Sequence, residues 1–274
     1  LNHSKNNKRD EKQLDLKTVL SSLEDILTNE SILKIGQNIK YDYKIFLKYG
    51  IELVSYDDTM LLSYVLFGGL HRHNLNFLSE KYLDHTPIKI SQLLGSGKSA
   101  MTFDKVEINK AKDYAAEDAD MTIRLWLLFK NKLSGFKVKK VYESLERPLI
   151  KILANMETEG ILVSKEKLTQ LSTNFSKKIK ILEKEIFEIS QENFNIASPK
   201  QLSEVLFSKM GFNRGQKNKS GNYSTGAEIL ENLANEGHIF PKKILDWRQL
   251  SKLKSTYTDS LIDHINSDTK RVHT

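Results

Sequence analysis

The feature that most constrains the fold of this chain is a change of pattern at Ser134-Gly135. Before it, short apolar runs typical of strands alternate with segments of helical spacing, whereas after it the pattern is almost wholly helical. Alternation of this kind favours an α/β arrangement. We therefore expect an α/β domain over residues 1–134, followed by a mostly helical domain over residues 135–274.

In the first part, two apolar runs, residues 32–36 and 51–54, are expected to form short strands. Asp58 precedes an apolar helical pattern and is expected to cap that helix, because a carboxylate can accept hydrogen bonds from free amides at a helix start. Residues 89–103 hold Gly95 and Gly97 and are expected to form a loop. Helical spacing is found over residues 14–27, 41–49, 59–67, 75–83 and 107–133.

The second part is expected to be a series of helices with one short strand over residues 161–163. Pro148 is expected to kink a helix over residues 138–159. Ser164 and Ser198-Pro199 have the residue types that begin helices, and Thr225 is expected to cap another. Further expected segments are a helix over residues 164–190, a polar loop over 211–226, and helices over 227–234 and 241–265.

The net charge of +7 falls mostly in the second half of the chain. A basic half favours a polyanionic partner such as nucleic acid. The alternative is a general bias towards lysine that has no functional meaning.

Cysteine is absent from the sequence, which excludes disulfides and thiolate metal sites. No apolar run is long enough for a membrane span, and the polar opening residues do not form a secretory leader. We therefore expect a cytoplasmic protein, without a membrane partner. Because the chain begins with Leu1, we also expect it to be part of a longer protein.

Three residues are candidates for metal-assisted hydrolysis of a phosphodiester. Tyr114 and Asp118 are four apart and share one face of the expected helix. Asp42 lies at the start of the helix that follows a strand, where α/β folds place functional groups. Carboxylates hold hard cations, and a phenol hydroxyl can orient a water molecule. The alternatives are a helix cap for Asp42 and an acidic surface pair for Tyr114 and Asp118.

A basic, hydroxyl-rich helix is the third candidate. It carries charge together with short hydroxyl donors, which suits contact with a nucleic-acid backbone without reading its sequence. The alternative is a solvated lysine face. The residues concerned are Arg248, Lys252, Lys254, Ser255 and Thr256.

These segments resemble the DNA polymerase I family, the family A DNA polymerases. KIGQNIKYD, YDDTMLLSYVL and YAAEDAD are similar to the exonuclease motifs of that family and the segment between them. NIASPKQLSEVLF, WRQLSKLKSTYTDSL and RVHT are similar to the region where its polymerase thumb begins. The two groups occur in the order that the family requires.

The resemblance implies a truncated ribonuclease H-like 3′→5′ exonuclease domain, followed by the N-terminal part of a polymerase domain with thumb helices. Asp42 and Asp118 would bind Mg²⁺ or Mn²⁺ in a two-metal site, Tyr114 would orient the attacking water, and Asn38 would contact substrate. The basic helix would grip primer-template DNA. The parent protein would be a monomeric DNA-directed DNA polymerase (a nucleotidyltransferase) acting in replication and repair.

The family's exonuclease site also needs an Asp-x-Glu pair, which this sequence lacks. In the family that pair precedes the position of residue 1, and the palm and fingers lie beyond RVHT. The resemblance therefore implies a fragment with little nuclease activity of its own. Two alternatives remain open, namely a stand-alone exonuclease of the same superfamily and a non-catalytic DNA-binding module.

Overall fold

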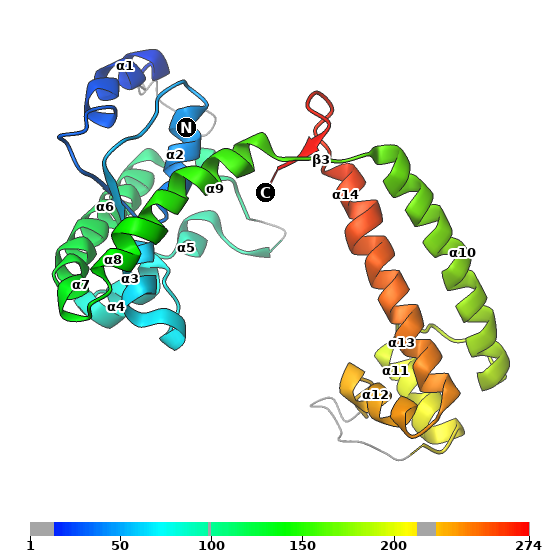
Figure 1. The fold of residues 1–274 in the computed structure, drawn as a ribbon. Helices are drawn as coiled ribbons and strands as arrows, with labels where there is room; N and C mark the ends of the chain where they lie inside the picture. Colours follow the sequence, from blue (N-terminus) through cyan, green and yellow to red (C-terminus); the bar gives the residue numbers. More distant parts are fainter. Residues whose placement is uncertain (1–13, 98–99, 213–222, 274) are drawn as a thin grey trace. The chain divides into compact units, whose positions relative to one another are not determined.

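The computed structural model of the chain describes residues 14–97, 100–212 and 223–273. The chain divides into two compact units, Leu1–Thr158 and Glu159–Thr274. The first unit mixes short strands with helices, and the second is almost wholly helical (Figure 1). This confirms the expected order of an α/β part followed by a helical part, and each unit is described by itself below.

The first unit contains two strands and a series of helices that follow the expected order. Asp15 caps the first helix by accepting a hydrogen bond from the Thr18 amide. The elements are α1 (Leu16–Leu27), β1 (Lys34–Gly36), α2 (Ile39–Leu47), β2 (Tyr56–Asp58), α3 (Thr59–Phe67), η1 (Gly68–Leu70), α4 (Leu75–Leu83), α5 (Ile90–Leu94), η3 (Phe103–Lys105), α6 (Ile108–Lys130), α7 (Lys132–Gly135), α8 (Lys139–Val141), η4 (Tyr142–Glu146) and α9 (Arg147–Glu159).

The two strands of this unit pair in parallel, with Lys34 opposite Tyr56. The prediction of a strand over residues 51–54 is therefore wrong, because the residues that pair with β1 lie at 56–58. Ile51 and Leu53 are buried in a hydrophobic core without pairing in a sheet. The apolar run correctly predicted that these residues are buried. It did not predict the strand, because the residues that pair with β1 come later.

One further expectation for the first unit needs correction, and another is refined. The expected loop over residues 89–103 contains the short helix α5 and reaches the first residue of η3. The helix expected over residues 138–159 is found as the consecutive elements α8, η4 and α9, with a π-helical turn, η4, directly before α9, and the kink at Pro148 stays a prediction. A π turn changes the hydrogen-bond spacing locally and so accommodates a proline whose nitrogen cannot donate.

Residues after Ser134 also pack into the first unit. Ile150 and Ala154 of α9 are buried with residues of α1 and α2, and Tyr142 is buried with residues of α3, α4 and α6. By packing, the unit ends at Thr158. The boundary expected between residues 134 and 135 separates an exonuclease domain from a polymerase domain, and it stays a prediction.

The second unit begins with a two-stranded antiparallel ribbon in which Ile161 lies opposite Val272. This confirms the expected strand near residue 161, whereas its partner β4 was not expected. The elements are β3 (Ile161–Leu162), α10 (Lys165–Ser190), α11 (Pro199–Ser203), η5 (Glu204–Lys209), α12 (Ala227–Asn235), α13 (Ile239–Lys252), η6 (Leu253–Asp259), α14 (Ser260–Asp263) and β4 (Arg271–Val272).

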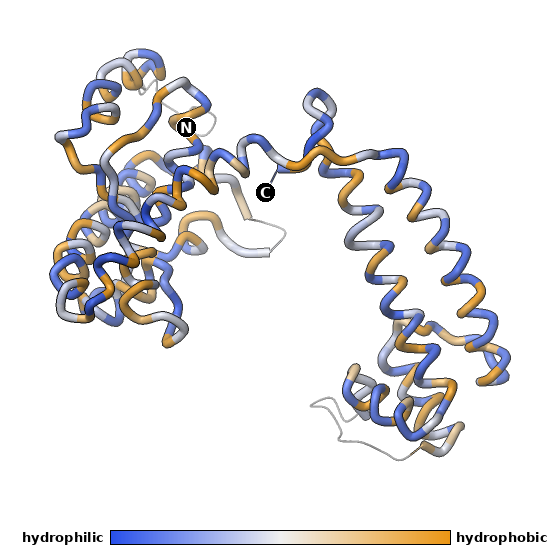
Figure 2. The backbone as a smooth tube through the Cα atoms, viewed as in Figure 1, coloured by the Kyte–Doolittle hydropathy of each residue, from blue (hydrophilic) through white to orange (hydrophobic). Residues whose placement is uncertain are grey.

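The long helix α10 lies beside the continuous run of α13, η6 and α14 (Figure 1). Hydrophilic and hydrophobic residues alternate along both (Figure 2), as expected for helices that bury one face. Their far ends meet α11, η5 and α12 in a core that includes the fully buried Leu202, Leu230 and Ile244. The helices expected over residues 164–190 and 241–265 are thus found, whereas their packing against each other was not predicted.

Helix starts in the second unit largely follow the expected caps. Ser164 accepts a hydrogen bond from the Lys167 amide, and Ser198 accepts one from the Gln201 amide. Thr225 was wrongly expected to cap α12, because Gly226 occupies that position. Most of the loop expected over residues 211–226 lies outside the described residues. None of the described helices combines the length and apolar character needed to cross a membrane.

Candidate functional site

The position of Asp42 is set by the way helix α2 begins. Asn38 takes a left-handed backbone conformation, with φ of 58°, which asparagine tolerates better than most residues. The Asn38 and Ile39 amides donate to the buried Asp58 carboxylate at 3.0 and 2.9 Å. Asp58 also accepts a 2.8 Å hydrogen bond from the Met60 amide. One carboxylate therefore fixes the starts of both α2 and α3.

A second contact holds α2 along its length. Lys40 and Lys44 lie one turn apart on α2, and both donate to Glu157 of α9. The Lys44 bond is 2.8 Å long, and the two lysines lower the pKa of Glu157. Asp42 lies between the two lysines in sequence but on a different face of the helix. The ion pairs thus direct the cationic side chains to α9 rather than to Asp42.

Asp42 is exposed, but the surrounding protein partly desolvates its carboxyl group and raises its pKa. A raised carboxyl pKa indicates that the ionised form lacks a compensating positive charge. A bound cation would supply that compensation.

Tyr114 and Asp118 lie on one face of α6 and hydrogen-bond to each other through their side chains. The i, i+4 spacing therefore brings these two groups together. Partial burial raises the pKa of Asp118, and the Glu117 charge acts in the same direction, while the Tyr114 hydroxyl opposes the shift. Burial and the Asp118 charge likewise raise the pKa of Tyr114, so its phenol is protonated at neutral pH and can donate.

The acidic residues around Asp118 each have another partner. Glu117 accepts from the Ile88 amide at 2.7 Å and lies 2.7 Å from His85 Nε2. Asp113 lies 3.3 Å from the Lys112 amine, and Asp120 lies 3.5 Å from the Arg124 guanidinium. The helix is therefore more than a uniform acidic surface, because Asp118 differs from its neighbours in being bonded by the Tyr114 phenol.

Asp42 and Asp118 are on elements close to the same strand, since α6 packs against β1 and only two residues separate the end of β1 from the start of α2. Among the interactions of described residues, none joins Asp42 to Asp118 or to Tyr114. Over the same ranges no group of three or more His, Asp and Glu side chains is arranged to hold a metal ion. The two carboxylates have the oxygen chemistry that Mg²⁺ and Mn²⁺ prefer, but they supply only part of a ligand set.

A buried network around Asp57 was not identified from the sequence. Asp57, only 5% exposed, accepts hydrogen bonds from Trp126 Nε1 at 2.8 Å, Tyr142 Oη at 3.0 Å and Arg147 Nη1 at 3.1 Å. Tyr142 Oη in turn accepts from the Asp58 amide at 2.9 Å. These residues are far apart in sequence, so spacing gave no signal. The network joins β2, α6, η4 and α9.

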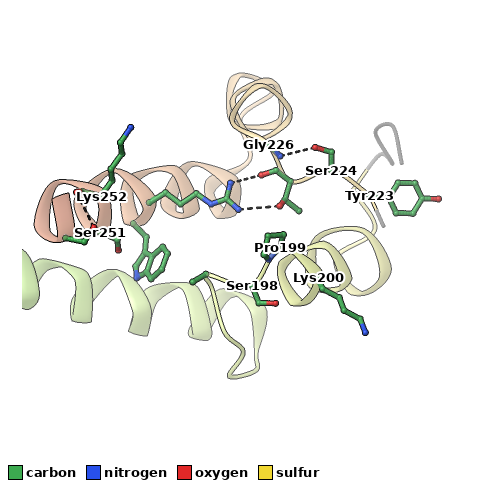
Figure 3. Close-up of a pocket in the computed structure, with 13 residues that line it drawn as sticks. Ser198, Pro199, Lys200, Tyr223, Ser224, Gly226, Ser251 and Lys252 are labelled. Atoms are coloured by element: carbon green, nitrogen blue, oxygen red, sulfur yellow. Dashed lines mark hydrogen bonds between the residues drawn. The ribbon is translucent and has the colours of Figure 1, made fainter. Parts of the chain in front are cut away.

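The second unit contains a cavity of about 960 Å³ beside the basic helix (Figure 3). Trp247, Arg248, Ser251, Lys252 and Ser255 line it from α13 and η6. The remaining lining residues lie at the start of α11 and on the segment before α12, and they are Ala197, Ser198, Pro199, Lys200, Tyr223, Ser224, Thr225 and Gly226. The cavity therefore combines lysines, hydroxyl groups and two aromatic rings.

The five basic-helix candidates occupy different environments. Arg248 Nη1 donates to the Thr225 carbonyl at 2.6 Å, so its guanidinium fastens the segment before α12. Lys254 donates to Asp259 at 2.5 Å. Lys252 and Ser255 are exposed and line the cavity, whereas Thr256 is exposed outside it. The structure thus brings Arg248, Lys252 and Ser255 to one cavity.

Several cavity residues were missed by sequence reasoning. Ser198 and Pro199 had been assigned only as a helix start, and Trp247 was noted only within the basic segment. Trp247 Nε1 donates to Glu183 of α10 at 3.1 Å, which fixes its ring beside the cavity. A cluster of hydroxyl and aromatic residues at a helix start next to a basic helix could have indicated the cavity, but the pairing of the two segments required the structure.

Two family models match successive segments of this chain. The family model for 3′-5′ exonuclease matches residues 6–134, and the model for DNA polymerase family A matches residues 165–274. The second match begins at the first residue of α10. The two matches follow one another along the chain, with a gap over residues 135–164.

Individual relatives agree with the family models. The chain is 51% identical over 262 residues to DNA polymerase I of Rhizobium leguminosarum, covering 96% of this chain and 26% of the relative. It is 39% identical over 267 residues to DNA polymerase I of Pseudomonas aeruginosa, covering 96% and 29%. The chain thus spans between a quarter and a third of the length of these relatives.

A solved structure is also similar, namely the POL domain of Pol1 from M. smegmatis in complex with DNA primer-template and dNTP. The TM-score is 0.71 at 25% identity, covering 97% of this chain and 43% of that one.

Proposed function

The chain belongs to the family A DNA polymerases, and on that premise we propose that it forms the 3′→5′ exonuclease and thumb-side part of a DNA-directed DNA polymerase of replication and repair. The observation that carries the proposal is the succession of an exonuclease match and a polymerase match along one chain. A stand-alone exonuclease would not need the second segment. The first domain would be a ribonuclease H-like exonuclease over residues 1–134, and the polymerase part would begin at residue 135.

In the exonuclease part, Asp42 and Asp118 are proposed as metal carboxylates. Tyr114 is proposed to orient the attacking water and Asn38 to contact the substrate strand. The raised pKa values of both carboxyl groups support this assignment, because a cation would stabilise their ionised forms. A pair of divalent cations would supply stabilisation of the attacking and leaving oxygens of the phosphodiester.

A metal-binding measurement tests the carboxylate assignment without relying on activity. Electron paramagnetic resonance of Mn²⁺ titrated into the protein should show weaker binding in Asp118→Asn and Asp42→Asn. The matched control is Asp120→Asn, which removes the same charge about half a turn further along α6, where Asp120 lies near Arg124. Equal Mn²⁺ affinity in all three variants would exclude Asp42 and Asp118 as ligands.

The 274 residues are proposed to have little nuclease activity alone, because the sequence lacks the Asp-x-Glu pair of the family site. Degradation of 3′-labelled single-stranded DNA in Mg²⁺ or Mn²⁺ should remain near background. Rapid 3′→5′ degradation that Asp118→Ala abolishes would show that the residues present suffice. Rapid degradation unaffected by Asp118→Ala would refute the catalytic assignment itself.

In the second unit, the cavity beside the basic helix is proposed to contact the backbone of primer-template duplex DNA. Lys252 and Ser255 line it, and Thr256 extends the hydroxyl-rich surface along η6. Lysine charge and hydroxyl donors suit phosphate oxygens, and such contacts position a duplex without reading its sequence. Arg248 would act by holding Thr225 at the cavity edge.

The test is binding of a fluorescently labelled duplex at several salt concentrations, measured by anisotropy. Replacing both Lys252 and Lys254 by alanine should weaken binding and reduce the salt slope by about 1, because one phosphate contact contributes about 0.9 and Lys254 is paired with Asp259. The matched control replaces Lys184 and Lys242, two exposed lysines of the same unit that do not line the cavity. If both double variants behave alike, the duplex contacts another surface.

A further inference from the structure

The segment η6 (Leu253–Asp259) is a π-helical turn inside the helix that carries the basic candidates. Its last hydrogen bond runs from the Ser260 amide to the Ser255 carbonyl, a spacing of five residues. Such turns are rare, are less favourable than an α-helix, and occur often at functional sites. Some feature of the surrounding structure must therefore stabilise this one.

The contact that suits this role is the ion pair between Lys254 and Asp259. Lys254 Nζ lies 2.5 Å from Asp259 Oδ2, although the residues are five apart. On an α-helix, residues five apart point about 140° from each other, so their side chains diverge. The π turn brings them to one side, and the ion pair in turn favours the π turn over an α-helix.

A neighbouring helix holds the same carboxylate. Ser172 Oγ of α10 donates to Asp259 Oδ1 at 2.5 Å. Thr258 Oγ1 donates to the Lys254 carbonyl at 2.7 Å, and Thr258 is only 3% exposed. The hydrogen bonds that Asp259 accepts from Lys254 and Ser172 lower its pKa, so the carboxylate is ionised at neutral pH. Lys254, Asp259 and Ser172 therefore form a cluster between η6 and α10.

The opposite side of η6 is free of this cluster. Ser255, Thr256 and Tyr257 are consecutive exposed residues, and the Tyr257 side chain is 52% exposed. Lys254 by contrast is only 28% exposed. The π turn thus separates the segment into an inner side, fastened to α10, and an outer side that presents two short hydroxyl groups and a phenol.

We infer that Asp259 is a positioning residue for duplex DNA binding, which fastens the π turn through Lys254 and Ser172 and so presents Ser255 and Thr256 outward. The inference rests on the proposed function of this surface. It assigns to an acidic residue a supporting role in binding a polyanion. Lys254 would thereby act through the fold of η6, in addition to any attraction its charge exerts on phosphate.

The inference can be tested because it predicts a change in duplex affinity opposite to the change expected from charge alone. Removing a negative charge near a polyanion should strengthen binding. If Asp259 positions η6, Asp259→Asn should instead raise the duplex dissociation constant about fivefold, the order expected from the net contribution of one ordinary hydrogen bond. The matched control is Asp263→Asn, an exposed aspartate of α14 that carries the same charge, and this variant should bind as tightly as the parent or slightly tighter.

Two further variants separate positioning from a general loss of structure. Ser172→Ala changes no charge and lies on α10, yet it should weaken duplex binding in the same direction as Asp259→Asn. Asp259→Glu, which keeps the carboxylate, should restore part of the affinity that Asp259→Asn loses. Circular dichroism and Trp247 emission should show that all variants retain the fold of the second unit.

The outcomes distinguish this inference from the proposed function. If the parent chain does not bind duplex DNA, or if replacing Lys252 and Lys254 has no effect, the proposed binding surface fails. If the parent binds as proposed but Asp259→Asn binds as tightly or tighter, and Ser172→Ala is unchanged, Asp259 is not a positioning residue. Weakened binding in both variants, with partial recovery in Asp259→Glu, supports the inference.

Discussion

The ion pair between the buried Asp57 and the partly exposed Arg147 of α9 should contribute more to stability than an exposed ion pair made by the same helix. Asp57 Oδ1 accepts from Tyr142 and Arg147, and Oδ2 accepts from Trp126. Asp57→Asn replaces one acceptor oxygen by an amino group. If the remaining oxygen faces Tyr142 and Arg147, the amino group faces the Trp126 Nε1–H, so two donors oppose each other and the indole loses its partner.

The expected magnitude follows from these contacts. An unsatisfied buried donor costs about 1–3 kcal/mol, and hydrogen bonds to a charged group contribute about 1.5–3 kcal/mol each. Breaking a buried ion pair typically costs about 3–5 kcal/mol. Because the Arg147 side chain is 36% exposed and can be partly hydrated, the lower end applies. Asp57→Asn should therefore lower the unfolding free energy of the first unit by about 3 kcal/mol.

The assay is urea unfolding with tryptophan emission. The chain has two tryptophans, Trp126 in the first unit and Trp247 in the second, so a Trp247→Phe background leaves a reporter for the first unit alone. A double-mutant cycle of Asp57→Asn with Arg147→Met should give a coupling energy of about 2 kcal/mol.

The comparison pair is Glu52 and Lys151. Lys151 lies one turn after Arg147 on α9, and both side chains of the pair are about half exposed. Exposed pairs of this kind contribute little because both charges remain hydrated. Their cycle, with Glu52→Gln and Lys151→Met, should give a coupling close to zero. Equal coupling energies for the two pairs would refute the argument that burial of Asp57 makes its network strong.

Two further predictions concern the C-terminal end of α9. Lys40 and Lys44 lower the pKa of Glu157 from its ordinary 4.5, so its stabilising effect is fully present above about pH 4.5 and is lost as pH falls through the lowered value. Urea unfolding of parent and Glu157→Gln should therefore differ at pH 7 and converge towards about pH 3, and a constant difference would contradict this. Gly160 has φ of +70° and an added Cβ would lie 2.7 Å from the Val272 carbonyl oxygen, so Gly160→Ala should destabilise the second unit by about 1–3 kcal/mol in thermal unfolding followed by Trp247. Gly135→Ala, where nothing lies within 4 Å, should have little effect.

Local features of this chain were predictable because they depend on neighbouring residues. The position of Tyr114 and Asp118 on one face of a helix followed from their spacing of four. Asp58 at the start of α3 and Ser164 at the start of α10 followed from the preference of short polar side chains for free helix amides. In each case the interacting groups lie within one turn, so tertiary structure had little to change.

Features that depend on distant residues were not predictable. The strand expected over residues 51–54 failed because an apolar run reports burial, whereas a strand also needs a partner in register. The role of Asp58 in fixing α2 depends on amides twenty residues earlier. The π turn at η6 was invisible because its sequence also suits an α-helix, and the contact of Asp259 with Ser172 spans 87 residues.

The segment that neither family model matches, residues 135–164, has a structural role that sequence comparison does not indicate. Its helix α9 places Ile150 and Ala154 in the core that also holds Ile39 and Tyr43 of α2. Glu157 of the same helix binds the two lysines on either side of Asp42 in sequence.

Arg147 and Tyr142 of this segment bind Asp57, the residue next to the carboxylate that fixes the start of α2. The position of Asp42 therefore depends on residues outside the matched exonuclease segment. A version of the first unit ending at residue 134 would lose these contacts, and α2 would be held by Asp58 and by its packing with residues before 134 in the same core. For this reason the packed unit ending at Thr158, rather than the segment matched by the exonuclease model, is the appropriate piece for studying the candidate carboxylate site.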